Sequence, residues 1–333
     1  MRRLWLGGLA AAALVAVAAL WLHDTPPMLQ ETADDLVASG VPGVLVRVRE
    51  GNEVRELAAG EATADARFRI GSVTKTFVAA LTLRLADAGV LGLDHPVERY
   101  APTLLSDGDR VTIRDLLDHT AGLFDYTSDP ALLRGELSPH ALVALSNGRE
   151  RGEGYTYSST NYLALGLVLQ AAAGAPLDEL LRRQVFERVG LRETTFETGR
   201  VEGPHLQGHE RPSHQGVATG TLRDTSSRNA RSAWAAGAVV STAADLDRFF
   251  TWLLGGELGR RMRPATGERY GLGLARFETP CGPVVGHTGN LLGTVTVVWA
   301  RGDRLLVVAA NVYPFTPEQE TKLQLLLGRA FCS

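Results

Sequence analysis

The stretch of sequence that decides the fold is Phe68-Arg69-Ile70-Gly71-Ser72-Val73-Thr74-Lys75-Thr76-Phe77. From Ser72 to Ala88 the chain contains no proline, and Gly89 stands where a helix would stop. Apolar side chains recur there at the spacing of one helix face, namely Val73, Phe77, Leu81 and Leu85. The pattern predicts a buried helix over residues 72–88.

Ser72 and Lys75 are three residues apart, so they share one face of this predicted helix. A serine hydroxyl is a weak nucleophile until a base takes its proton. A lysine can be that base only where burial or nearby positive charge lowers its pKa. We expect Ser72 in the first helical turn, where the helix dipole and free N–H groups stabilise negative charge. The pair indicates nucleophilic catalysis, although this spacing alone is common in proteins.

Strands are expected on both sides of this helix along the chain. They cover residues 43–49, 53–58, 67–70, 284–288, 294–300 and 305–311. Gly51-Asn52 and Gly302-Asp303 are expected to form the turns of two hairpins. Helices are predicted to begin at Glu31, before the first strand, and to cover residues 317–330, after the last.

The middle of the chain is predicted to be helical. Helices are expected at 112–117, 162–173, 177–189 and 242–255, with loops over 199–233. The fold class predicted is α/β plus all-α, an antiparallel sheet built from the N- and C-terminal segments, flanked by helices, with an inserted helical lobe. The folded domain would cover 25–333, with the α/β part at about 28–90 and 260–333 and the lobe at about 91–259.

Composition and charge narrow the class of partner. The 333 residues include 34 Lys and Arg and 37 Asp and Glu, a formal net charge of −3 without a basic block. This balance argues against nucleic acid as the principal partner. His205, His209 and His214 are close in sequence but have no carboxylate or cysteine complement, so we predict no metal site. No cofactor is expected either, and the expected partner is a small molecule or peptide.

The N-terminal residues predict export. Arg2 and Arg3 precede nineteen uncharged residues, 4–22, which as a helix would span about 28 Å, enough to cross a bilayer. Ala16-Val17-Ala18 offers a signal-peptide cleavage site, but cutting there would leave an apolar terminus. Residues 1–24 are therefore expected to be a membrane anchor or a signal peptide. Either one places the domain outside the cytoplasm, in the cell envelope or beyond it.

Residues 68–77 closely resemble the active-site segment of class C β-lactamases and D-alanyl-D-alanine carboxypeptidases, in the serine β-lactamase and penicillin-binding protein superfamily. Further segments follow in the family's order over roughly residues 30–330. They are Leu116-Leu117-Asp118-His119-Thr120-Ala121-Gly122-Leu123, Tyr157-Ser158-Ser159-Thr160-Asn161-Tyr162, Trp234 to Phe250, and Gly286-His287-Thr288-Gly289. Chance does not explain several motifs in one order.

The resemblance implies a catalytic set of Ser72, Lys75, Tyr157 and His287. In this set Tyr157 would share proton transfer with Lys75. His287 is expected to titrate near neutrality, where it could shuttle a proton or hold the tyrosine and substrate electrostatically. His119, in contrast, is assigned to structure, in a turn after a helix.

The resemblance also implies the residues that bind substrate. The backbone N–H groups of Ser72 and Asn290 would form the oxyanion hole, and Gly289 would let the substrate backbone approach. Thr288 would contact a substrate carboxylate or amide. Ser159 and Trp234 complete the expected substrate-binding set.

Two positions depart from the family's pattern, and both concern substrate binding. The second motif usually reads Tyr-x-Asn, and Ser159 replaces the asparagine whose amide holds a substrate amide. Ala275 stands where a basic residue helps to hold a terminal carboxylate, and strand alternation would point the neighbouring Arg276 to the other face. Acyl transfer is still expected, whereas the peptide substrate is in doubt.

The chain has two cysteines, Cys281 and Cys332. In an oxidising compartment they could form a disulfide or remain two separate buried thiols. The resemblance implies a Cys281–Cys332 bond that ties the last helix to the sheet.

The leading expectation for function is a D-alanyl-D-alanine carboxypeptidase or close relative that acts through an acyl-enzyme on Ser72. An esterase or β-lactamase on the same scaffold is the second. A third, of another class, is a non-catalytic penicillin-binding or regulatory protein of the envelope. The presence of Ser72, Lys75 and Tyr157 together argues against this third reading.

Overall fold

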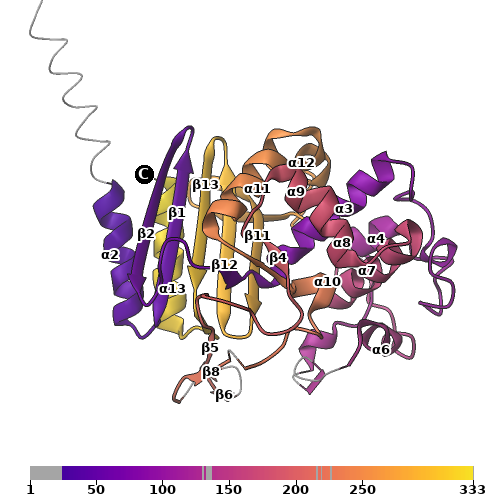
Figure 1. Cartoon of the computed structure of the whole chain (residues 1–333), viewed down its shortest axis with the longest axis horizontal. Coiled ribbons are helices and arrows are strands. Elements are labelled where there is room, and N and C mark those ends of the chain that lie inside the picture. The colour runs from indigo at the N-terminus through magenta and orange to yellow at the C-terminus, as the bar shows by residue number, and fades with distance from the viewer. Residues whose placement is uncertain are drawn as a thin grey trace, which may run out of the picture.

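The structure is a computed structural model that describes residues 25–129, 131–132, 137–214, 217–218, 220–225 and 227–332. The expected anchor or signal peptide lies outside the described residues. A central sheet separates two helices on one face from a larger group of helices on the other (Figure 1). The fold is the predicted one, because the sheet joins strands from both ends of the chain and the helical part is inserted between them.

The sheet has six antiparallel strands in the order β10-β11-β12-β13-β1-β2. Their bounds are β1 Gly43–Glu50, β2 Glu53–Gly60, β10 Ala275–Thr279, β11 Gly282–Leu291, β12 Thr294–Arg301 and β13 Arg304–Ala310. The N-terminal hairpin joins the C-terminal strands where β1 pairs with β13. Both predicted turns are present, with φ of 58° at Gly51 and 62° at Gly302, a conformation that glycine adopts without strain.

Strand β13 shows how the sheet is buried on both faces. Its residues alternate between two hydrophobic clusters, since Leu305, Val307 and Ala309 face one and Leu306, Val308 and Ala310 face the other. The second cluster includes side chains of the two terminal helices, α2 (Thr25–Ala38) and α13 (Pro317–Cys332). These two helices lie side by side against the sheet (Figure 1).

On the opposite face, α3 (Thr74–Asp87) and α11 (Ala243–Gly255) contribute to the first cluster. The rings of Phe77 and Phe249 stack at 3.7 Å between centroids, and Phe186 meets Phe77 edge-on at 5.9 Å. Helix α11 is capped at its N-terminus, because Thr242 Oγ1 accepts the N–H of Asp245. The helix that carries Lys75 is thus held inside the protein by aromatic packing.

The inserted part consists mainly of short helices. They are α4 Ile113–Asp118, α6 Pro139–Ala144, α7 Ser159–Ala173, α8 Leu177–Leu181, α9 Glu187–Val189, α10 Trp234–Gly237 and α12 Glu257–Met262, with 3₁₀ turns η1 Gly71–Val73, η2 Val97–Arg99 and η3 Tyr126–Ser128 and a π-helical segment η4 Arg182–Phe186. The helix expected over 177–189 is continuous through α8, η4 and α9.

Within the described residues, no single helix is both long and apolar enough to cross a bilayer. The pair Ser159–Ala173 and Leu177–Val189 has sufficient length and apolar composition only when the two helices are taken together, and they are bent by 81° relative to each other. Residues 159–169 of α7 are buried inside the protein.

The smaller strands form three additional sheets. The strands are β3 Phe68–Arg69, β4 Thr195–Phe196, β5 His209–Glu210, β6 Ser213–His214, β7 Val217–Ala218, β8 Arg223–Asp224, β9 Val239–Ser241 and β14 Val312–Tyr313. They pair as β14-β5-β8, β3-β9-β4 and β6-β7. The 199–233 region, expected as loops, therefore contains four two-residue strands, whose length is too short to leave a periodic pattern in the sequence.

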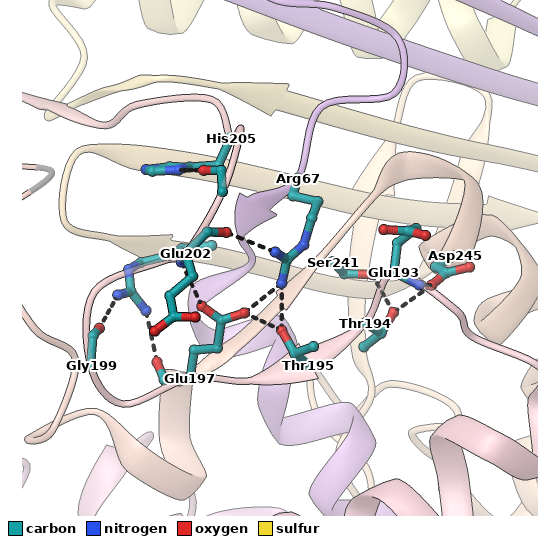
Figure 2. A network of polar contacts seen from close by, with 12 residues as sticks. Arg67, Glu193, Thr194, Thr195, Glu197, Gly199, Glu202, His205, Ser241 and Asp245 are labelled. Carbon is teal, nitrogen blue, oxygen red and sulfur yellow. Dashed lines mark hydrogen bonds and ion pairs between the residues drawn. The ribbon is translucent and has the colours of Figure 1, made fainter.

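A polar network fixes strand β3, which leads to Ser72 (Figure 2). Arg67, just before β3, donates to Thr195, to the Glu197 carboxylate and to the carbonyl of Glu202. Arg69 donates to the carbonyls of Glu197 and Gly199. The two arginines hold the segment 195–202 against β3, two residues before Gly71.

The structure contains the disulfide that the resemblance implied. Cys281 and Cys332 are bonded, with their Cα atoms 5.5 Å apart. The bond connects the end of α13 to the residue before β11.

Candidate active site

Ser72 lies in the 3₁₀ turn η1, and α3 begins two residues later at Thr74. This corrects the expectation that Ser72 would stand in the first turn of the α-helix. The physical reason is Gly71, whose φ of +50° turns the chain sharply out of β3 and produces a tighter turn first. Lys75, not Ser72, occupies the first turn of α3.

Lys75 is fully buried, and its Nζ lies 2.8 Å from Ser72 Oγ and 3.1 Å from the carbonyl oxygen of Ala236. Burial lowers the pKa of Lys75 to about 7, and the Asp125 carboxylate partly opposes that shift. Near neutral pH a large share of the amine is therefore uncharged. In that form Nζ can donate to Ala236 and accept the proton of Ser72.

Tyr157 closes the site beside the lysine. Its ring centroid lies 5.1 Å from Lys75 Nζ. Burial raises the pKa of Tyr157 far above its usual value, while a hydrogen bond with Ser72 acts in the opposite direction. Tyr157 is thus a neutral phenol at physiological pH. It can donate or relay a proton, but in this protonated state it cannot act as the base that deprotonates Ser72.

His119 supports Tyr157 from behind. The side chain is completely buried, its ring centroid lies 4.2 Å from that of Tyr157, and its Nδ1 accepts the backbone N–H of Ser158. Burial holds the pKa of His119 well below its usual value. The histidine is therefore a neutral packing group that fixes the segment around Tyr157, which agrees with its assignment to structure.

His287 differs from the expectation of a group that titrates near neutrality. Burial lowers its pKa to about 3, and the nearby Lys75 acts in the same direction. Its Nδ1 lies 2.6 Å from the carbonyl oxygen of Thr288, so Nδ1 carries the proton. Its Nε2, 2.9 Å from the hydroxyl of Tyr270, must then accept a hydrogen bond from that phenol. Both ring nitrogens of His287 are therefore engaged in hydrogen bonds within the protein, so this geometry does not fit a proton shuttle.

Strand β11 places a free edge beside the serine. Strand β10 pairs with β11 only as far as Ala275 and Gly286, so the edge is open from His287 onward. A Cβ on Gly289 would lie 2.0 Å from the carbonyl oxygen of Ile70 and 2.8 Å from the backbone nitrogen of Ser72. A Cβ on Gly71 would lie 2.7 Å from the backbone nitrogen of Asn290. The backbones of η1 and β11 therefore touch, which brings the Ser72 and Asn290 N–H groups together.

Ser159 begins α7, and its backbone N–H donates to Asp125 Oδ1 at 3.0 Å. Asp125 also accepts the backbone N–H and the hydroxyl of Thr127. Its carboxylate was not identified from the sequence, although it stands two residues after the Leu116–Leu123 motif. Tyr270 was missed as well, because no local pattern distinguishes it from a core tyrosine.

Trp234 does not join the site. Its half-buried indole packs against α7, where a Cβ on Gly166 would come within 2.7 Å of the ring. Among the described residues, the lining of the cavity at Ser72 does not include Trp234. We therefore correct its expected role from substrate binding to the packing of α10 on α7.

The structure also shows the surroundings of Ala275, which stands where the family has a basic residue. Ala275 pairs with Gly286 and lines the cavity. Arg276 lines it as well, contrary to the expectation from strand alternation, and donates to Glu278 at 2.8 Å. Arg228 also lines the cavity, but it pairs with Glu210 at 3.0 Å. Arg269, from a different segment, is an exposed positive charge on the cavity wall that forms no salt bridge with the described residues.

One cavity of about 1190 Å³ joins these groups. The expected site residues on its wall are Ser72, Tyr157, Ser159, His287, Thr288, Gly289 and Asn290. It extends past the free edge of β11 to apolar residues near α13, including Phe315, Leu323 and Leu327. Within the described part of the chain, no group of three or more His, Cys, Asp and Glu side chains could hold a metal ion.

Comparisons with known proteins agree with this geometry. The sequence profile of the family described as Beta-lactamase matches residues 29–327. A D-stereospecific amidohydrolase from Streptomyces sp. superposes with a TM-score of 0.81 at 29% identity, over 91% of this chain and 98% of that one. A D-amino acid amidase from Ochrobactrum anthropi SV3, complexed with L-phenylalanine amide, gives a TM-score of 0.80 at 25% identity, over 92% and 98%.

The curated sequence relatives match over shorter parts of the chain than these solved structures do. Penicillin-binding protein 4* of Bacillus subtilis (strain 168) is 31% identical over 136 residues, which is 38% of this chain and 30% of that protein. The chain spans less than two thirds of the length of this and several other curated relatives.

Proposed function

We propose that this chain, which belongs to the beta-lactamase family, hydrolyses amide or ester bonds through an acyl-enzyme on Ser72. The observation that carries the proposal is the 2.8 Å contact between Ser72 Oγ and the Nζ of a buried lysine whose pKa is about 7. A neutral amine at that distance can accept the serine proton at physiological pH.

The chemistry follows from the positions of the groups. Ser72 Oγ attacks the substrate carbonyl carbon as its proton passes to Lys75, and the new oxyanion lies between the N–H groups of Ser72 and Asn290. The bond to the leaving group breaks as that group takes a proton from Lys75, directly or through the Tyr157 phenol. Water then attacks the ester and gives a proton to Lys75, and Lys75 passes that proton to Ser72 Oγ as the acid leaves, which restores Ser72. His287 stays neutral and positions the strand.

For the substrate, we propose a compound whose leaving group carries no obligatory carboxylate. Ala275 is uncharged, and the neutral His287 is already hydrogen-bonded through both nitrogens, so neither supplies a cation on the β11 side. The likeness to a D-stereospecific amidohydrolase and a D-amino acid amidase supports amides of D-amino acids or related esters as the first substrates to try.

A second candidate is the D-alanyl-D-alanine carboxypeptidase that the sequence motifs suggest. The observation in its favour is Arg269, an exposed cation on the cavity wall that could hold a terminal carboxylate in place of the missing basic residue. In this case D-alanine release should fall at least 10-fold in Arg269→Ala, because a charge-assisted hydrogen bond is worth about 1.5–3 kcal/mol.

We also propose that the domain acts outside the cytoplasm. The Cys281–Cys332 disulfide supports an oxidising compartment, as do the uncharged residues 4–22. The periplasm, the cell surface and the medium all meet this condition.

The test follows intact protein mass over time with three reagents, namely a D-amino acid amide, a D-alanyl-D-alanine peptide and a fluorescent penicillin. We expect the mass of the protein to increase by one acyl group. The increase should be absent in Ser72→Ala and present in the control Ser106→Ala, because Ser106 is an exposed serine outside the cavity lining. Turnover of the amide without D-alanine release supports the amidase, and D-alanine release supports the carboxypeptidase. A stable penicillin adduct with no turnover of any substrate would establish the non-catalytic binder instead.

A further inference from the structure

One charged residue of the cavity that takes no part in the proposed mechanism is Asp125. Asp125 lines the cavity beside Ser72, Tyr157 and Ser159. Its hydrogen bonds come from neutral donors, two from Thr127 and one from the backbone of Ser159. No salt bridge formed by the described residues includes it, whereas the cavity arginines Arg228 and Arg276 are both paired with glutamates.

The carboxylate is fixed in position. Oδ1 accepts the N–H groups of Thr127 and Ser159 at 3.2 and 3.0 Å, and Oδ2 accepts the Thr127 hydroxyl at 2.7 Å. Three donors from two segments define the orientation of the carboxyl plane, and each oxygen has two lone pairs. Oδ2 therefore keeps acceptor capacity for one more donor from the cavity.

Its place in the cavity determines which part of a substrate it meets. The oxyanion hole and the free edge of β11 lie on the sheet side of Ser72, while Asp125 and Ser159 belong to the helical part. Ser72, Ser159 and Asp125 line the same cavity, so a substituent on the α-carbon of a carbonyl bound at Ser72 can extend toward Asp125.

The two sides of the cavity differ in charge. On the β11 side, Ala275 is apolar and His287 is neutral and hydrogen-bonded through both ring nitrogens, so neither of them supplies a cation for a substrate carboxylate. On the helical side a fixed carboxylate faces the cavity. A cationic group of a ligand can pair with this carboxylate through a charge-assisted hydrogen bond.

We infer that Asp125 binds the free α-ammonium group of the substrate's acyl part. This inference rests on the proposed acyl-enzyme at Ser72 and makes it more specific. The substrate class is then amides, esters or peptides of an amino acid with an unblocked amino group, and acylation of that group would remove the charge and add bulk against Asp125.

The test compares methyl esters that differ only at this position, those of D-alanine, L-alanine, N-acetyl-D-alanine and propionic acid, with the released acid measured by mass spectrometry. In the wild-type protein we expect kcat/KM for the better alanine ester to exceed that for the propionate ester at least 10-fold. In Asp125→Asn, this ratio should fall by about 10- to 100-fold, the effect of losing a hydrogen bond to a charged group.

Asp129→Asn is the matched control, because it makes the same charge change four residues away and Asp129 does not line the cavity among the described residues. Its ratio should stay within a factor of 2 of the wild-type ratio. The inference is overturned if N-acetyl-D-alanine ester reacts as well as the free amines, or if Asp125→Asn leaves the ratio unchanged while Ser72 still becomes acylated. Absence of any Ser72 adduct with all four esters would overturn the proposed function itself.

Discussion

Burial lowers the pKa of both Lys75 and His287, but the chemical result differs between the two residues. It brings the pKa of Lys75 down to about 7, so that the amine titrates in the physiological range. It brings the pKa of His287 to about 3, so that the imidazole stays neutral. The residue type usually associated with titration near neutrality is therefore the fixed one here, and the lysine is the group that changes charge.

The first prediction concerns pH. Only the neutral form of Lys75 can accept the Ser72 proton, and that form becomes dominant above its pKa. We expect kcat/KM for an uncharged ester to rise between pH 5.5 and about 7 and then to level off. A profile of kcat/KM from pH 5 to 9 measures it. Activity that falls as the pH rises through 7 would contradict the assignment of Lys75 as base.

A second prediction tests the same residue by substitution. Lys75→Arg keeps the positive charge at every pH and removes the base, so kcat/KM should fall by about 10²- to 10⁴-fold. The variant Lys322→Arg, on α13 at the protein surface, is the control for the chemical change. Retention of more than a tenth of the activity by Lys75→Arg would argue against Lys75 as the base.

The third prediction concerns Tyr270 as a positioning residue. Tyr270→Phe removes the donor to His287 Nε2 and leaves a buried acceptor without a partner. The free energy of unfolding should drop by about 1–3 kcal/mol, measured by urea unfolding. Tyr313→Phe is the control, since this tyrosine is 41% exposed. An unchanged unfolding free energy in Tyr270→Phe would show that the contact does not hold His287.

At the level of elements, the proposed oxyanion hole depends on a close crossing of η1 and β11. Gly71 and Gly289 each face the backbone of the other segment, at distances that leave no space for a Cβ. The absence of two side chains thus lets a turn and a strand from opposite ends of the chain bring their N–H groups together.

The fourth prediction follows from this crossing. Gly289→Ala places a methyl group 2.0 Å from the carbonyl oxygen of Ile70, so η1 and β11 must separate. We expect acylation at least 10²-fold slower, as for the loss of an oxyanion-hole donor, measured by intact mass against time. Gly328→Ala on α13, where a Cβ would have nothing within 4 Å, should leave acylation unchanged. Wild-type acylation in Gly289→Ala would contradict the crossing.

At the scale of the whole molecule, covalent and ionic links join distant segments of the fold. Asp247 of α11 receives hydrogen bonds from Arg47 and Arg49 of β1 at 2.6–2.8 Å, which ties the sheet to the helices on its catalytic face. The disulfide ties α13 to β11 from the other side. Strand β11 is thus held in place at the end opposite to its catalytic residues.

The fifth prediction concerns the disulfide. The two cysteines are separated by 51 positions, and closing a loop of that length is worth about 4 kcal/mol in the chain-entropy account. Unfolding in urea should shift to lower concentration when a reductant is added. The double variant Cys281→Ser with Cys332→Ser should show the lower midpoint with or without reductant. A midpoint that reductant does not change in the wild-type protein would contradict a stabilising bond.

Much of the fold follows from local sequence patterns. Alternating and continuous apolar runs predict the strands, and helical spacing with terminal glycines predicts α3 and α11 to within a few residues. Two-residue strands such as β5 and β8 are not predictable in this way, because they repeat no period. The tight turn at Ser72 was also missed, since it depends on how Gly71 leaves β3.

The sequence by itself determined which chemistry-bearing residues the chain has and in what order, because motif spacing is local and covalent. Only the tertiary structure decided their environment. The charge state of Lys75 and His287, the role of Tyr270, the packing of Trp234 against α7 and the exposure of Asp125 to the cavity all depend on atoms brought together from distant segments. Desolvation and hydrogen bonding act over a few ångströms in space, whatever the separation along the chain, and so no pattern of neighbouring residues records them.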